Sequence, residues 1–288
     1  MKISKPLFIL SVLIILLAAV ATITGLVSDK PAEVTEVTSV FGERISLYGK
    51  GIYRYDSVSM AAQAIAADVV TLGVGIPLLI IALVWSNKEA LGGKLLLTGT
   101  LGYFLYTYAS MTFLAFYNQL FLVYVALFSL SLFALVLAFQ QVKIDELPQR
   151  FSISLPVKWI SGSLIFIGAM LLFMWMGRIV PSLNGKVAPF GLDHYNTLVI
   201  QALDLGLIVP LAILSAVLLL RKKPWGFMLS AVILIKGLTL SLAIIAMIIA
   251  QVGAGVTVSP VEVVVFPLFA ALVFWMVVIL FKNIIPSE

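Results

Sequence analysis

Eight stretches of about 20 mostly apolar residues constrain the fold of this chain more than any other feature. A helix that crosses a membrane needs roughly 20 apolar residues, because each residue rises about 1.5 Å and the hydrocarbon layer is about 30 Å thick. With 62% hydrophobic and only 11% charged residues, the chain has too little charge for a soluble domain, in which about 25% is usual. The sequence therefore predicts an all-α integral membrane protein with eight transmembrane helices. The stretches lie near residues 6–28, 60–85, 95–116, 119–140, 159–180, 196–220, 225–250 and 261–281.

The distribution of lysine and arginine predicts the orientation, since positively charged short loops stay in the cytoplasm. With the N-terminus inside, 11 of the 18 cations fall in inner segments, and the inner, outer and intramembrane net charges are +7, −1 and −1. We therefore expect both termini in the cytoplasm, at a plasma membrane of prokaryotic type. The first stretch resembles a secretory signal, but its length favours an uncleaved anchor.

The two halves of the chain have the same order of predicted helices, loops and turns, which predicts an internal duplication. Pro77 and Gly93 have the same separation as Pro210 and Gly226, and the segments around the two prolines are similar in sequence. Four spans are an even number, so both halves enter from the same side and the repeat is parallel. We expect two four-helix membrane repeats, 1–145 and 146–288, with a functional site at their interface.

The longest outer segment, residues 29–59, belongs to the first repeat. Its β-branched residues alternate around Phe41-Gly42-Glu43, a pattern that predicts a small hairpin. Aromatic and charged residues then follow each other up to Met60, as is typical of a segment at the membrane surface. A cap over the outer face is favoured over a ligand-binding loop.

Three ionisable residues lie inside predicted spans, namely Asp68, Asp204 and Lys236. Such residues cost about 2.5–3.5 kcal/mol each even on insertion scales, so each needs a partner or a functional role. One interpretation is a ligand site; the alternative is an internal salt bridge that fixes the helix packing. Arg178 and Glu262 could extend this cluster outward, but ordinary interfacial charges are favoured for both.

Polar neighbours share a helical face with the two acids, because Thr71 follows Asp68 by three residues and Gln201 precedes Asp204 by three. In the register that aligns Pro77 with Pro210, Thr71 falls on Asp204 and Tyr103 falls on Lys236. Positions that are equivalent in the two halves thus have different side chains, which indicates one asymmetric cavity shared by both halves. The predicted substrate-binding residues are Asp68, Thr71, Tyr103, Tyr106, Gln201, Asp204 and Lys236.

Several kinds of chemistry find no support in the sequence. The chain has no cysteine and a single histidine, His194, which excludes disulfides, thiolate metal sites and metal centres built from several imidazoles. No nucleotide-binding loop or catalytic triad is present. We assign no catalytic residue, no metal site and no cofactor. The expected partners are membrane lipids and a small solute; no nucleic acid is expected, and the sequence names no protein partner.

Three functions remain open at this point. Transport or binding of a small polar or cationic solute, or of protons, is favoured because intramembrane charges usually mark such sites. A non-catalytic accessory or sensory membrane component is the first alternative. The second is a membrane-embedded enzyme that acts on a lipid or an isoprenoid, with Asp68 or Asp204 as general acid or base.

Overall fold

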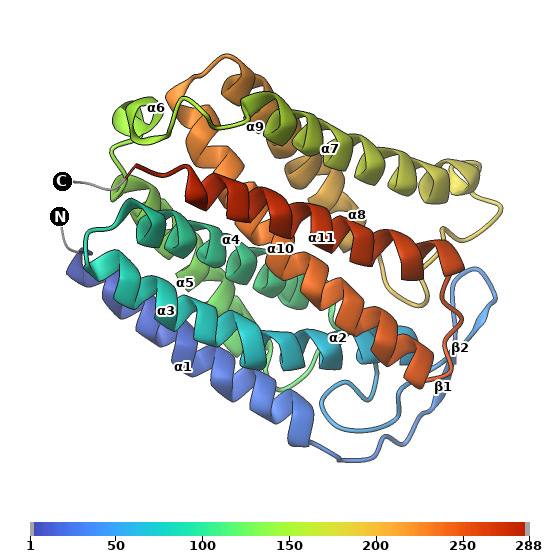
Figure 1. The fold of residues 1–288 in the computed structure, drawn as a ribbon. Helices are drawn as coiled ribbons and strands as arrows, with labels where there is room; N and C mark the ends of the chain where they lie inside the picture. Colours follow the sequence, from blue (N-terminus) through green and yellow to red (C-terminus); the bar gives the residue numbers. More distant parts are fainter. Residues whose placement is uncertain (1–2, 286–288) are drawn as a thin grey trace.

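The computed structural model describes residues 3–285, which fold mostly into helices (Figure 1). Among these residues, seven helices are long and apolar enough to cross a membrane, as expected for an all-α, multi-pass membrane protein. The seven are α1 (Lys5–Val27), the continuous helix α2–η1–α3 (Val58–Asn87), α5 (Phe121–Gln140), α7 with η3 (Val157–Ser182), the continuous helix α8–η4–α9 (Val199–Leu220), α10 (Pro224–Gly253) and α11 (Pro260–Lys282).

The predicted third span, 95–116, forms α4 (Leu91–Leu114), which is 24 residues long but less apolar than the other seven helices. It packs against α3 (Ile76–Asn87), α5 and α10, and more than half of its residues are buried. Because protein rather than lipid surrounds most of α4, its threonines and tyrosines need not face hydrocarbon. Seven of the eight predicted membrane crossings therefore fall on helices that are apolar enough to span. The eighth crossing, by α4, remains a prediction.

The helices are organised around α4 and α10. In the first half, α3 and α5 pack on α4, and α1 packs on α5; in the second, α9 (Val209–Leu220) and α11 pack on α10, and α7 packs on α9. Two clusters of buried apolar side chains correspond to these groups. Helix α10 also packs on α4 and on α2 (Val58–Val70), so it joins the two groups.

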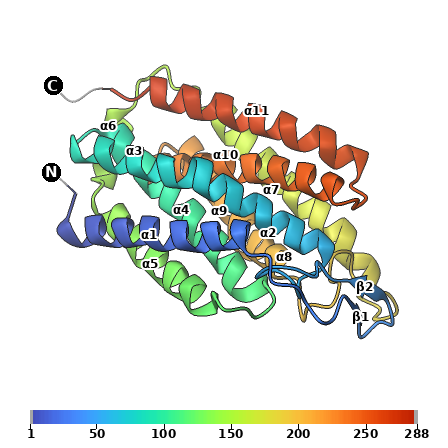
Figure 2. The same cartoon turned by 90° about the horizontal axis from the view of Figure 1, so that it is seen from below.

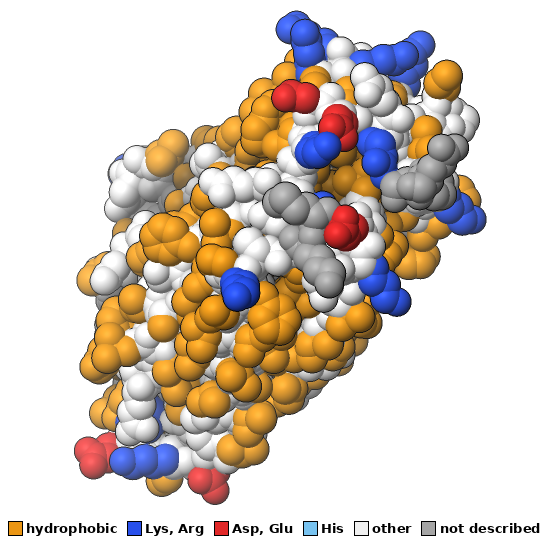
Figure 3. Space-filling view, turned by 90° about the vertical axis from the view of Figure 1, so that its left-hand side faces the viewer, with side chains coloured by type: hydrophobic (Ala, Val, Ile, Leu, Met, Phe, Trp, Pro, Cys, Tyr) orange, Lys and Arg blue, Asp and Glu red, His pale blue; other side chains and the backbone are white. Residues whose placement is uncertain are grey.

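Both ends of the described chain lie at the same end of the helical bundle, together with the short helix α6 (Leu147–Arg150) (Figures 1 and 2). Lysine and arginine side chains gather at this end, above a mostly hydrophobic surface (Figure 3). The opposite end carries the predicted hairpin. Its strands β1 (Glu36–Thr38) and β2 (Arg44–Ser46) are antiparallel, and Gly42 between them has a positive φ of 83°. The hairpin prediction is confirmed, whereas the cellular side of each end remains a prediction.

Local backbone features recur in the register that aligns Pro77 with Pro210. Two π-helical turns, η1 (Thr71–Gly75) and η4 (Asp204–Ile208), begin at the paired positions and lead into the proline of the next helix. In the turns that follow, Glu89 and Lys222 have φ values of 64° and 50°. These pairs agree with the predicted duplication, which itself stays a prediction.

The two halves differ in how their first and last helices meet. Helix α1 packs along α5 in the first half. In the second half, α7 packs on α9 and α11 packs on α10, with no comparable contact between α7 and α11 among residues 3–285. Side chains of α7 and α11 instead line a cavity.

Candidate functional site

A cavity of about 230 Å³ lies between α2, α4, α7, α10 and α11. Its lining is mostly apolar and includes side chains from both halves of the chain. Methionine is flexible and polarisable, so it can adapt to ligands of different shape. Five of the nine methionines line the cavity, namely Met60, Met111, Met170, Met174 and Met247.

Asp204 begins the π-helical turn η4 and has hydrogen-bond donors on both carboxylate oxygens. Tyr106 of α4 donates to Oδ1 at 2.7 Å, and the indole of Trp175 on α7 donates to Oδ2 at 2.9 Å. The residue is only 5% exposed. Two strong donors compensate for much of the cost of burying this acid, and each of its oxygens already accepts a hydrogen bond from the protein.

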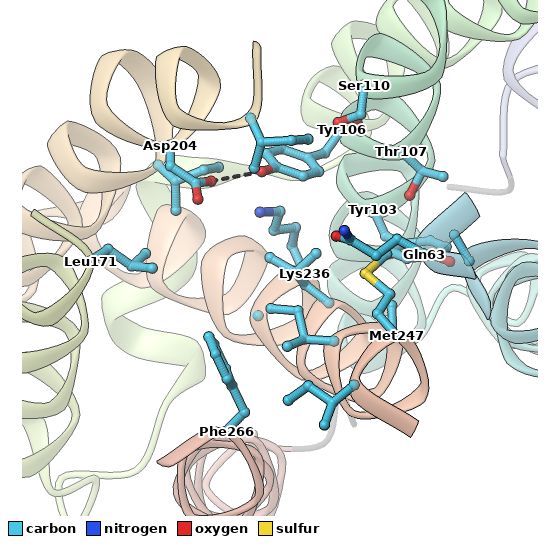
Figure 4. Close-up of a pocket in the computed structure, with 18 of the residues that line it drawn as sticks. Gln63, Tyr103, Tyr106, Thr107, Ser110, Leu171, Asp204, Lys236, Met247 and Phe266 are labelled. Carbon is cyan, nitrogen blue, oxygen red and sulfur yellow. Dashed lines mark hydrogen bonds between the residues drawn. The ribbon is translucent and has the colours of Figure 1, made fainter. Parts of the chain in front are cut away.

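Lys236 lies in the middle of α10 and is 3% exposed. Within residues 3–285, no hydrogen-bond acceptor or carboxylate contacts its Nζ. The ammonium instead lies 3.6 Å from the centroid of the Tyr106 ring, a favourable contact that does not use its three N–H donors. Figure 4 shows the side chain pointing into the cavity beside Asp204 and Tyr106. The result is a buried cation with free donors next to an acid that is already satisfied.

Asp68 lies outside the lining of the cavity. Its Oδ2 accepts a hydrogen bond from Tyr53 at 2.7 Å, and the same oxygen lies so close to Gly25 of α1 that a Cβ there would overlap it. Thr71, one turn further along, is 2.8 Å from the hydroxyl of Tyr103. Asp68 therefore helps to join α1, the outer loop and α2, on the other side of Tyr103.

The cavity thus brings together four of the seven residues that the sequence predicts, from α4, η4 and α10. The other three lie outside its lining. A role in ligand binding stays a prediction for all seven. The four in the lining are Tyr103, Tyr106, Asp204 and Lys236, and the three outside are Asp68, Thr71 and Gln201.

The end of the cavity nearer the hairpin is lined by charged and amide side chains. Arg178 of α7 forms an ion pair with Glu262 of α11 and also lies over the rings of Trp175 and Phe190. The expectation that both charges only face the headgroups is incomplete, because they pair with each other across the cavity mouth. Their sequence positions at two distant helix ends do not reveal this pairing.

Asp56 lies at the same end, in the outer loop just before α2, and is buried. Burial raises the pKa of this carboxyl to about 6, although hydrogen bonds to Oδ1 from the Phe116 amide and the Tyr195 hydroxyl favour the charged form. Oδ2 is buried without a hydrogen-bond partner. The protonated acid is therefore favoured in the folded protein up to about pH 6.

This raised pKa predicts a pH-dependent loss of stability. The contribution of Asp56 is complete below its unfolded pKa of about 4 and is lost as the pH rises through about 6, because the folded state binds the proton more tightly. A shift of about two pKa units corresponds to roughly 3 kcal/mol. We expect the melting temperature to fall between pH 4 and 7, and Asp56→Asn to flatten this profile because the amide keeps the acceptor. An identical slope in the variant would contradict the assignment.

Several residues of the cavity give no signal in the sequence. Trp175 and Gln63 lie in the lining, but each is an ordinary residue for a membrane helix or its end. Helical spacing identifies polar residues that lie near an intramembrane acid on the same helix. Trp175 contacts Asp204 from a different helix, so spacing does not reveal it. Among residues 3–285, no group of three His, Asp or Glu side chains is placed to hold a metal ion.

Fold and cavity together define the class: a multi-pass α-helical membrane protein with a largely apolar internal cavity that contains a buried lysine. Comparison with known proteins adds no family to this class, since no family model, no curated protein and no solved structure matches the chain.

Proposed function

We propose that the protein binds a small anionic ligand inside the membrane, with Lys236 as the charged contact, and that it transports this ligand. One observation carries the proposal: Nζ of Lys236 is buried with no acceptor among residues 3–285 and points into a cavity, while both oxygens of the neighbouring Asp204 already accept hydrogen bonds. A buried ammonium without a partner is costly, and an anion would supply the missing acceptor. The sequence favours a small polar or cationic solute, or protons; the proposed ligand instead has a negative charge.

The same contacts argue against a purely structural salt bridge. Asp204 meets Tyr106 and Trp175, and neither of its oxygens is within 4 Å of the Lys236 ammonium. A lysine retained only for packing would be expected to donate to a carboxylate or a backbone carbonyl. Its three donors remain free for a ligand.

Transport is supported by the breaks in two helices that flank the cavity. The π-helical turns η1 and η4 each precede a proline, Pro77 or Pro210. Such turns are frequent at functional sites and are places where helices bend. In this proposal the parallel duplication supplies two bundles that move relative to each other, in a prokaryotic plasma membrane with both termini in the cytoplasm. Membrane lipids are the expected surroundings.

An enzyme acting on a lipid is the second candidate, because its substrate would also need an apolar cavity. Acid or base catalysis by Asp204 would require an oxygen free to exchange a proton with the substrate. Both oxygens already accept hydrogen bonds from protein donors. Binding and transport therefore come first.

A matched pair of ligands tests the sign of the charge. We expect hexanoate to raise the melting temperature of the purified protein in a neutral detergent, and hexylammonium to leave it unchanged, because only the carboxylate can accept from Lys236. A ligand at about 100 times its Kd stabilises the native state by about 2.7 kcal/mol. Stabilisation by the amine alone would instead support a cationic solute. No response to either, nor to longer anions, would contradict the proposed function.

A further inference from the structure

Side chains of α7 and α11, two helices with few close backbone contacts to each other, line the proposed anion site. We propose that its ligand is an acidic amphiphile, with an anionic head group at Lys236 and an apolar chain that lies between α7 and α11 and reaches the lipid. This inference rests on the proposed function and specifies its substrate class. Carboxylates and phosphate monoesters with one long chain share the required chemistry.

The walls formed by α7 and α11 suit a hydrocarbon chain. Met170 and Met174 of α7 and Phe266 and Phe269 of α11 line the cavity, and all four side chains are apolar. Figure 4 shows Phe266 and Leu171 on the side of the cavity away from Gln63 and Tyr103. A small hydrophilic anion would leave these surfaces without a partner, whereas a chain would contact them.

The outer faces of the same two helices indicate where the opening leads. Phe173 of α7 is 74% exposed and Leu268 of α11 is 66% exposed, so both faces are suited to lipid. In this proposal the chain leaves the cavity between α7 and α11, which pack on α9 and α10 rather than closely on each other, and reaches the hydrocarbon. In the first half, by contrast, α1 packs along α5.

The outer entrance is more restricted. Arg178 and Glu262 join α7 to α11 at their outer ends, and together with Gln251 they line both the cavity and a second pocket outside it. A polar solute that came from the outer side would pass this ion pair. An amphiphile would enter below it, from the membrane, with its head group drawn toward Lys236.

Photolabelling tests the ligand class. The probe is a long-chain carboxylic acid with a diazirine midway along its chain, added to the full chain in nanodiscs of neutral lipid. We expect labelling of cavity-lining Met174 that falls at least tenfold in Lys236→Met, while labelling of the outward-facing Phe173 stays unchanged. Unlabelled long-chain acid should compete, and the alcohol of the same chain length should not.

The competitors separate failure of this inference from failure of the proposed function. If hexanoate competes as well as the long-chain acid at equal membrane concentration, the proposal of an amphiphilic ligand is wrong, but the proposal of an anion site is not contradicted. If the alcohol competes as well as the acid, both proposals are wrong. A long-chain alkyl phosphate should also compete. If it competes at a lower concentration than the acid, the head group is a phosphate; if it needs a higher concentration, the head group is a carboxylate. Both results support an amphiphilic ligand.

A reversible clamp tests the route. The chain contains no cysteine, so Arg178→Cys/Glu262→Cys introduces the only two thiols, which a short cleavable bifunctional reagent can link. We expect the link to leave the rate of Met174 labelling unchanged, because the proposed ligand enters from the membrane below these helix ends. Labelling that slows at least tenfold and recovers after cleavage would show entry at the helix ends and would contradict the proposed route. Ser4→Cys/Gln141→Cys, at a contact between the start of α1 and the end of α5, controls for effects of the reagent itself.

Discussion

Replacing Lys236 with methionine is expected to weaken anion binding by about ten- to a hundredfold and, at the same time, to raise the melting temperature of the protein. A hydrogen bond to a charged group contributes about 1.5–3 kcal/mol, which corresponds to that loss of affinity. Lysine at the centre of a membrane helix costs about 2.5–3.5 kcal/mol on insertion scales. Its ammonium has no acceptor in the described part of the chain, so methionine removes the cost and, among polar and ring contacts there, breaks only that with Tyr106.

A variant that loses ligand affinity but gains thermal stability has changed a ligand site. A variant at a structural site would lose stability. Titration with a radiolabelled anion and thermal unfolding without ligand measure the two effects separately. Lys236→Arg keeps the charge and should retain most of the affinity, and Lys223→Met changes an exposed lysine in the turn before α10 and should alter neither quantity. Loss of folded protein in Lys236→Met would show that the lysine holds the helices together. Unchanged affinity would remove it from the site.

The contrast between Asp204 and Asp68 shows how much of the site the sequence could predict. Each acid stands out because it interrupts a long apolar stretch, and that signal needs no structure. Which neighbours it meets depends on how each helix is rotated about its axis. Asp204 faces Tyr106 and Trp175 on two other helices, whereas Asp68 faces Tyr53 and Gly25, away from the cavity. Spacing along one helix contains no information on this rotation.

Helix α4 illustrates a similar limit for the fold. Length and hydropathy identify helices that face lipid, because a lipid-facing surface must be apolar. Helix α4 is surrounded by α3, α5 and α10, and it can therefore contain Thr98, Thr100 and Tyr103 as buried residues. The apolar pattern predicted where this helix lies, but its central position follows only from the packing.

The turns that join α3 to α4 and α9 to α10 provide the second large expected effect. A Cβ added at Gly93 would overlap the backbone at Ser86, and a Cβ at Gly226 would overlap the backbone at Leu219. Backbone atoms cannot move aside as a flexible side chain can, so the two helices would have to separate. Overpacking of this kind costs about 1–3 kcal/mol or more. We expect Gly93→Ala and Gly226→Ala each to lower the melting temperature by several degrees.

Gly162 of α7 is the matched control, because a Cβ there meets no atom within 4 Å and alanine is the better helix former by about 1 kcal/mol. Gly162→Ala should therefore be neutral or stabilising. The paired positions also test the duplication. Each glycine faces the residue seven positions before it in its own half, so two turns of common origin and geometry should lose comparable stability when changed one at a time. Because the two turns are separate sites, their losses should add in the double variant. A harmless substitution at one glycine and a severe one at the other would show that the turns, although matched in backbone, do not have the same role in the packing of the two halves.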